Sequence, residues 1–171
     1  MKTDPSISPV VTQLIEKLGH ELQQYGEMLA LLDQQQQSVI ARAAEQVLNS
    51  VALINEQMSR IHTARQDRET CQKEIARQLG KPEDPAFTSL IPLLPEKFRV
   101  AVETLVRENN GLLLRVQKRA RQNHLLLSRS LEMMQQFMDA LIPGKGPTTY
   151  DGTGQVQSGR KAAQILYEGV G

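Results

Sequence analysis

The sequence predicts an all-α protein in which an antiparallel hairpin of two long helices and a third long helix form a coiled-coil-like bundle, followed by a flexible C-terminal tail. Aromatic residues make up only 4% of the 171 residues and Trp is absent, a composition that disfavours a large β-sheet. Pro and Gly are concentrated in residues 80–95 and 143–159, which leaves long stretches almost free of helix breakers. In those stretches apolar residues recur in steps of mostly three and four, as in helices that pack side by side.

The first two helices are expected over residues 9–36 and 42–79. Ser8 is the candidate N-cap of the first helix, and Pro9 suits its first position because that amide proton would lack a partner in any case. The predicted seam runs through both helices and comprises Val11, Ile15, Leu18, Leu22, Tyr25, Leu29, Leu32, Val39, Ala43, Val47, Val51, Ile54, Met58 and Ile61.

A turn between residues 34 and 44 is expected to fold these helices into a hairpin. The seam lapses only in the polar run 33–38, and Ser38 is a candidate cap for the second helix. Because neither Gly nor Pro marks this turn, the alternative is one continuous helix over residues 9–79, about 105 Å long.

The third long helix is expected over residues 96–142. Gly80 ends the second helix, and four prolines in residues 82–95 leave room only for short helical turns around residues 87–94. The predicted packing stripe of the third helix comprises Phe98, Val102, Leu105, Leu112, Val116, Ala120, Leu127, Met134, Met138 and Leu141, with Arg107, Lys118, Arg121 and Arg129 on the opposite face.

The chain is therefore divided into a helical bundle domain over residues 1–142 and a flexible tail over 143–171. Five Gly and two Pro precede Arg160 in this tail, a composition typical of flexible segments. Residues 160–168 are apolar enough to form a short helix, which would need a surface to order it.

Charge and hydropathy exclude several classes of function. The net charge of +1 gives no overall attraction to nucleic acid or anionic membranes, and the basic group around Arg115, Lys118, Arg119 and Arg121 lacks interleaved aromatic residues. The longest apolar run, residues 28–32, is too short to insert in a membrane, and no targeting signal is recognised at the N-terminus. A cytoplasmic protein is expected.

No catalytic residue, cofactor or metal site is predicted. Cys71 has no second cysteine and no companion that would identify it as a nucleophile. The three histidines, His20, His62 and His124, lack partners at metal-ligand spacing, and Gly144-Lys145-Gly146 does not have the frame of a phosphate-binding loop.

Asn109 and Asn123 lie two heptads apart within the apolar stripe of the third helix. Polar residues buried in a helical seam need partners and tend to fix register and helix number. We therefore expect these two asparagines to specify the register of the bundle.

Apolar residues near the end of the third helix spread over more than one packing stripe. Two other helices of the same bundle could use this breadth, or it could form a groove for a helix of another chain, to which methionines adapt well. The candidate binding residues, called here the C-terminal apolar surface, are Leu125, Leu127, Leu131, Met133, Met134, Phe137, Met138 and Leu141.

The chain resembles the FlgN family of flagellar export chaperones. The residues that carry this resemblance are Asn109-Asn110-Gly111-Leu112-Leu113, Asn123, Leu131, Pro147-Thr148-Thr149-Tyr150, Gly154-Gln155 and Gly159-Arg160-Lys161. The resemblance implies a cytoplasmic chaperone, without catalytic activity, that binds the C-terminal helical segments of hook-filament junction proteins and hands them to the flagellar export gate. It also implies that Tyr150 contacts the export apparatus.

Two other functions are compatible with the residues themselves. One is a structural coiled-coil adaptor that associates with copies of itself, and the other is a helical protein that binds nucleic acid through residues 115–121. For a chaperone we expect a monomer or a weak homodimer.

Overall fold

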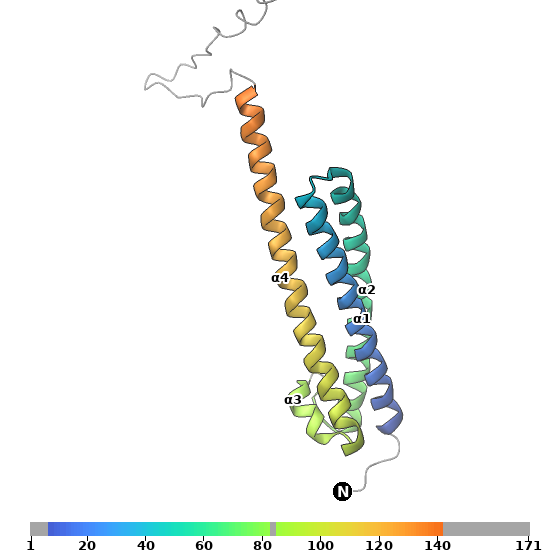
Figure 1. The fold of residues 1–171 in the computed structure, drawn as a ribbon. Coiled ribbons are helices and arrows are strands. Elements are labelled where there is room, and N and C mark those ends of the chain that lie inside the picture. Colours follow the sequence, from blue (N-terminus) through green and yellow to red (C-terminus); the bar gives the residue numbers. More distant parts are fainter. Residues whose placement is uncertain (1–6, 83–84, 142–171) are drawn as a thin grey trace, which may run out of the picture. The chain divides into compact units, whose positions relative to one another are not determined.

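The computed structural model describes residues 7–82 and 85–141. These residues form α1 (Ile7–Ile40), α2 (Ala44–Gln78), α3 (Phe87–Leu90), the 3-10 helix η1 (Ile91–Leu93) and α4 (Glu96–Leu141), with no strand among them. The helix α1 packs against both α2 and α4 (Figure 1). The predicted all-α class is therefore confirmed. The predicted tail over 143–171, its short helix over 160–168 and Tyr150 lie outside the described residues.

The chain divides into two compact units, residues 1–124 and 125–171. The first contains α1, α2, the short helices and most of α4, and the second begins with the last turns of α4. The predicted domain boundary at residue 142 stays a prediction.

The hairpin turn occupies residues 41–43, and the alternative of one continuous helix is wrong. Arg42 adopts φ 56°, in the left-handed region, and its amide donates to the carbonyl of Val39 at 3.1 Å. The next amide, of Ala43, donates to the carbonyl of Ser38 at 2.9 Å. This pair of hydrogen bonds is the Schellman arrangement, which usually has Gly at the left-handed position. An arginine takes that position here, so the turn carries no sequence signal.

The two predicted helix caps are also wrong. Because α1 begins at Ile7 and ends at Ile40, Ser8 and Ser38 both lie inside it. The hydroxyl of Ser38 is directed to its own helix and donates to the carbonyl of Gln34 at 3.1 Å. The end of α2 agrees with the prediction, since Gly80 adopts φ 62° directly after that helix.

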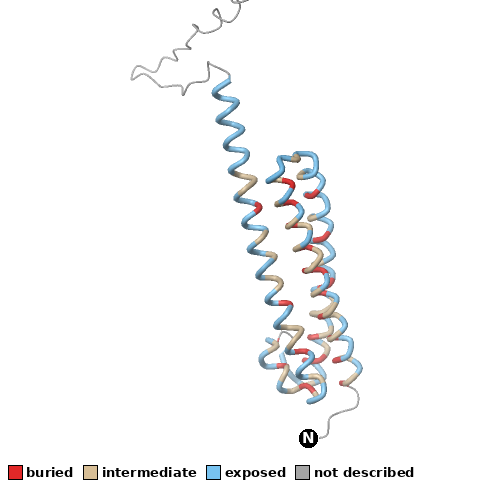
Figure 2. Tube along the Cα trace, in the orientation of Figure 1, coloured by how far each residue is buried: buried red, intermediate tan, exposed pale blue. Residues whose placement is uncertain are grey.

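The seam between α1 and α2 contains polar residues where the sequence predicted apolar ones. In α1 the buried positions advance in alternating steps of four and three: Ile7, Val11, Leu14, Leu18, Glu21, Tyr25, Met28, Leu32 and Gln35. The predicted seam residues Ile15, Leu22 and Leu29 are only half-buried beside this row. In Figure 2 the buried residues recur at intervals along α1 and α2.

In α2 the predicted seam residues Val51 and Met58 are exposed, and Ser50 and Gln57 are buried in their place. Both polar side chains have partners on α1. The amide of Gln57 donates to the backbone and side-chain oxygens of Gln24, each at 2.9 Å, and Gln35 donates to Ser50 Oγ at 3.0 Å. Because their hydrogen bonds are satisfied, these residues can be buried without the full cost of desolvation.

An apolar core lies where the start of α1, the end of α2, the short helices and the start of α4 meet. Its buried members are Ile7, Val11, Leu14, Leu18, Ile75, Leu90, Leu94 and Val102. The short helices α3 and η1 contribute Leu90 and, packed against the core, Phe87 and Ile91. The predicted helical turns around residues 87–94 are confirmed.

A buried ion pair joins α1 to α2 above this core. The Nε of Arg68 lies 3.0 Å from Glu21 Oε2, and the side chains are only 14% and 5% exposed. The other carboxylate oxygen of Glu21 accepts a hydrogen bond from the hydroxyl of Tyr25 at 3.0 Å. Burial, with the nearby charge of Glu21, raises the pKa of Tyr25 to about 12. Arg68 also donates to Gln72, which donates to the carbonyl of Pro85 at 2.6 Å.

Replacing Arg68 by Leu should lower the free energy of unfolding by about 3 kcal/mol, because the buried carboxylate of Glu21 would keep only the half-exposed Arg65, whose Nε lies 4.0 Å away. Urea denaturation followed by circular dichroism measures this loss. The matched control is Arg60→Leu, since Arg60 pairs with Glu56 at 2.7 Å but both side chains are more than half exposed. That change should cost less than about 1 kcal/mol. Equal losses in the two variants would contradict the assignment of a buried pair.

Candidate functional site

Asn109 and Asn123 connect α4 to the backbone of α1. The side-chain amide of Asn109 donates to the carbonyl of Leu18 at 2.9 Å, and that of Asn123 donates to the carbonyl of Leu32 at 2.7 Å. Asn123 also donates to Gln35 Oε1 at 3.1 Å. Both contacts join residues that are 91 positions apart in the sequence, so α1 and α4 run in the same direction and in a single register.

The two asparagines are buried, with exposures of 6% and 2%, and the Oδ1 atom of each has no hydrogen-bond partner. An unsatisfied buried carbonyl oxygen costs free energy, which offsets part of the stabilisation that these hydrogen bonds supply. The positions agree with the sequence analysis, while the role in specifying register stays a prediction.

Further polar contacts between α1 and α4 accompany the asparagines. The guanidinium of Arg119 lies 2.7 Å from Asp33 Oδ1 and also donates to the side chain of Gln36. These polar contacts lie beyond the apolar core, which α4 joins through Val102.

Replacing Asn123 by Leu should leave the free energy of unfolding unchanged or higher, because the unsatisfied Oδ1 is removed and an apolar side chain is buried. The loss of the register contact should instead appear as a change of association state in analytical ultracentrifugation, and Asn109→Leu should behave in the same way. Asn110→Leu is the control, since Asn110 is exposed on the same turn. A large loss of melting temperature in both variants, with no new oligomer, would contradict this prediction.

The C-terminal apolar surface lies on the last turns of α4. Every side chain from Arg129 to Leu141 is exposed. Met133, Phe137 and Leu141 are 65%, 63% and 60% exposed. Of the eight candidate residues only Leu127 is half-buried; the others are exposed: Leu125, Leu131, Met133, Met134, Phe137, Met138 and Leu141.

The predicted packing stripe of the third helix is therefore wrong after Leu127. Met134, Met138 and Leu141 were expected on that stripe and are exposed. Ala120 is exposed as well.

Large exposed apolar side chains in such a run are uncommon on proteins without a partner. Charged residues are sparse among them, with only Arg129, Glu132 and Asp139 in this part of α4. The run combines unbranched methionines, whose side chains adapt to different shapes, with leucines and one phenylalanine. These properties suit a surface that binds an apolar helix face.

A second group of exposed apolar residues on α2 was not expected from the sequence. Leu48 and Met58 are 73% and 59% exposed, and Leu53 contributes to a shallow groove between α1 and α2. The other lining residues of this groove are Glu27, Ala30, Leu31, Gln34, Glu56, Gln57 and Arg60. Because most of these are polar or charged, the groove resembles ordinary hydrated surface. The sequence analysis missed this group because it placed Met58 in the seam between α1 and α2. In the structure the neighbouring Gln57 is buried there and Met58 is exposed.

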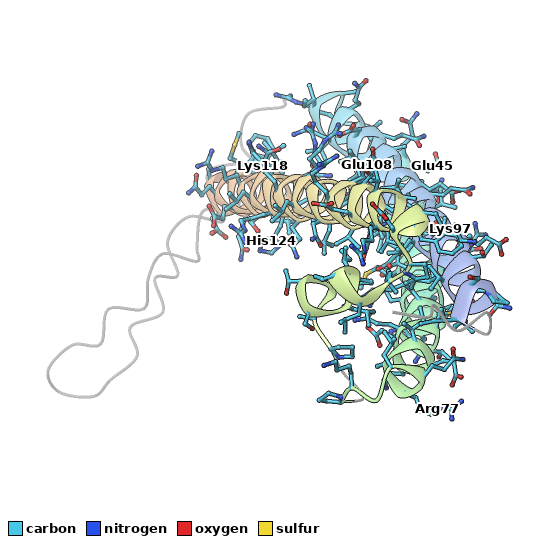
Figure 3. The ribbon with its side chains drawn as sticks, turned by 90° about the horizontal axis from the view of Figure 1, so that it is seen from below. Glu45, Arg77, Lys97, Glu108, Lys118 and His124 are labelled. Atoms are coloured by element: carbon cyan, nitrogen blue, oxygen red, sulfur yellow. The ribbon has the colours of Figure 1, made fainter. Side chains whose placement is uncertain are left out.

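The candidate metal ligands and the single cysteine lie apart from one another in the described residues. No three His, Cys, Asp or Glu side chains within 7–82 and 85–141 come together to hold a metal ion. Cys71 is half-buried, and burial raises the pKa of its thiol, which disfavours the reactive thiolate. Lys118 and His124, labelled in Figure 3, lie exposed on α4. In the described parts of the chain, no helix combines the length and the apolar character needed to cross a bilayer.

Comparison with known proteins gives one match. The family model described as FlgN protein matches residues 1–158. No curated protein and no solved structure matches the chain. The matched range includes all described helices and Tyr150, and it leaves residues 159–171 outside.

Proposed function

The chain belongs to the FlgN family of flagellar export chaperones, and we propose that it binds the C-terminal helical segments of hook-filament junction proteins and delivers them to the flagellar type III export gate. The bundle of residues 1–142 would hold the client, and the tail over 143–171 would serve the delivery step. The protein would act in the cytoplasm, where clients are collected before export, and its role requires neither a cofactor nor a catalytic residue.

The exposure of the C-terminal apolar surface is the observation that supports client binding most strongly. Five of its members follow one another in steps of four and three: Leu127, Leu131, Met134, Met138 and Leu141. This is the spacing with which one helix packs along another. An amphipathic client helix placed here would bury its own apolar face together with that of α4, and this burial would keep client chains from associating prematurely.

The same spacing would also accept a second copy of the chain, which is the alternative of a self-associating coiled-coil adaptor. The two functions differ in their dependence on a client. A chaperone should sediment as a monomer or weak homodimer and form a defined complex with client, whereas an adaptor should form stable oligomers alone.

Replacing Met134 or Leu141 by Ala should weaken client binding by about 1–3 kcal/mol each, the scale of central residues in an interface. Both side chains belong to the row that would contact the client and are largely exposed, at 65% and 60%, so the melting temperature should stay unchanged. Calorimetry with a synthetic peptide of a junction protein's C-terminal helix measures the affinity. Leu114→Ala is the matched control, because Leu114 is 65% exposed on the same helix but outside the surface. Unchanged affinity in both test variants would place the client site elsewhere.

Replacing Tyr150 by Ala should lower export of the client while leaving its affinity for the chaperone unchanged, if this tyrosine contacts the export gate as proposed. A secretion assay in a flagellated cell, read beside the calorimetry, separates the two effects. Tyr150→Phe keeps the aromatic ring and tests whether the hydroxyl is needed. Normal export in the Tyr150→Ala variant would remove this residue from the gate contact.

A further inference from the structure

The chain contains a segment that suits the C-terminal apolar surface and lies beyond the range of the family match. The match ends at residue 158, and the chain continues to Gly171. We propose that residues 160–170 of the same chain cover the C-terminal apolar surface while no client is bound, and that a client displaces them. The displacement step rests on the function proposed above, whereas the intramolecular contact does not.

Four apolar residues of this segment have the spacing of one helix face, and Ala162 and Ile165 lie off that face. Ala163, Leu166, Tyr167 and Val170 stand at positions i, i+3, i+4 and i+7, which share one side of a helix. A helix of this length is marginal alone in water. Packing against exposed apolar side chains would supply the stabilisation that it lacks, in the same mode that an amphipathic client helix would use.

The intervening residues are long enough to permit this contact. A Gly-rich chain spans about 5–6 Å multiplied by the square root of its residue number, or about 20–25 Å for the link over residues 142–159. The helical surface from Arg129 to Leu141 extends over about 18 Å at 1.5 Å per residue. The segment can therefore return to any part of the surface.

Charges favour the antiparallel orientation that a returning segment would adopt. Asp139 lies near the end of α4 and Arg129 about three turns earlier. The segment begins with Arg160 and Lys161 and carries Glu168 near its end. In an antiparallel pairing the two basic residues approach Asp139, while Glu168 falls between Glu132 and Arg129, whose charges offset each other. A parallel pairing would place Arg160 near Arg129 and Glu168 near Asp139, and both of these like-charge approaches are unfavourable.

Covalent linkage makes a weak contact sufficient. A short flexible link gives an effective concentration in the millimolar range, so a segment with an intrinsic dissociation constant of about 1 mM would cover the surface in roughly half of the molecules. The apparent affinity for a client falls in proportion to the fraction of open molecules. The segment should therefore weaken client binding by about 2–10-fold, which a client helix of ordinary affinity can overcome.

Fluorescence can test the contact without any client. The sequence contains no Trp, so Phe137→Trp in the full chain places a single reporter on the surface. We expect a blue-shifted emission, protected from acrylamide quenching and independent of protein concentration. Adding Leu166→Asp should shift the emission to that of an exposed indole. Adding Gln164→Asp, which introduces the same charge off the apolar face, should leave the emission unchanged.

Two results would overturn the proposal. An exposed emission in the chain with an unchanged tail would show that the segment does not cover the surface. A blue shift that depends on protein concentration would assign the surface to a second copy of the chain.

Calorimetry with the junction-protein peptide then tests displacement. Leu166→Asp, in the chain that keeps Phe137, should lower the dissociation constant by about 2–10-fold, and Gln164→Asp should not. Suppose that Leu166→Asp exposes the indole in the fluorescence experiment but leaves the affinity for the peptide unchanged. This result would contradict the proposal that a client displaces the segment. If the peptide binds to no form of the chain, the proposed function fails, while the fluorescence result still decides the intramolecular contact.

Discussion

Two asparagine amides of α4 bind backbone carbonyls of α1. Interlocking apolar side chains tolerate small displacements along a helix, whereas a hydrogen bond to a particular carbonyl does not. Because the contacts of Asn109 and Asn123 repeat after two heptads, a shift of α4 by one turn would break both. The prediction that these asparagines specify the register of the bundle rests on this geometry.

The stability and the specificity of the bundle have different origins. The apolar core at one end joins all three long helices and the short helices between α2 and α4, so most of the hydrophobic stabilisation is concentrated there. Farther along α1 the seam contains Glu21, Gln24, Gln35 and their partners on α2. Buried polar groups with satisfied hydrogen bonds add little net stability. A hairpin with another alignment of α1 and α2 would bury the same groups without their partners, which costs free energy.

The all-α class, the lengths of the helices and the connection after Gly80 were predictable because Pro, Gly and apolar spacing report directly on backbone conformation. The turn at Arg42 was not, since its conformation is imposed by the hydrogen bonds that close α1. The seam of α2 was misplaced by one residue, since Gln57 is buried and Met58 is exposed. The burial of Gln57 depends on its hydrogen bonds to Gln24 of α1, which the sequence does not reveal. The exposure of Met138 could not be predicted, because its spacing fits the packing stripe of the third helix.

The separation of 91 residues between each asparagine and the carbonyl that it binds bears on the order of events during synthesis. The hairpin of α1 and α2 closes through a three-residue turn and can form as soon as residue 78 has left the ribosome, because local contacts carry the smaller entropic cost. The carbonyls of Leu18 and Leu32 lie inside a helix and are already bonded within it. The nascent hairpin therefore leaves neither of these two carbonyls without a hydrogen bond before α4 is made. Of the described long helices, α4, which carries the apolar surface, is the last to pack.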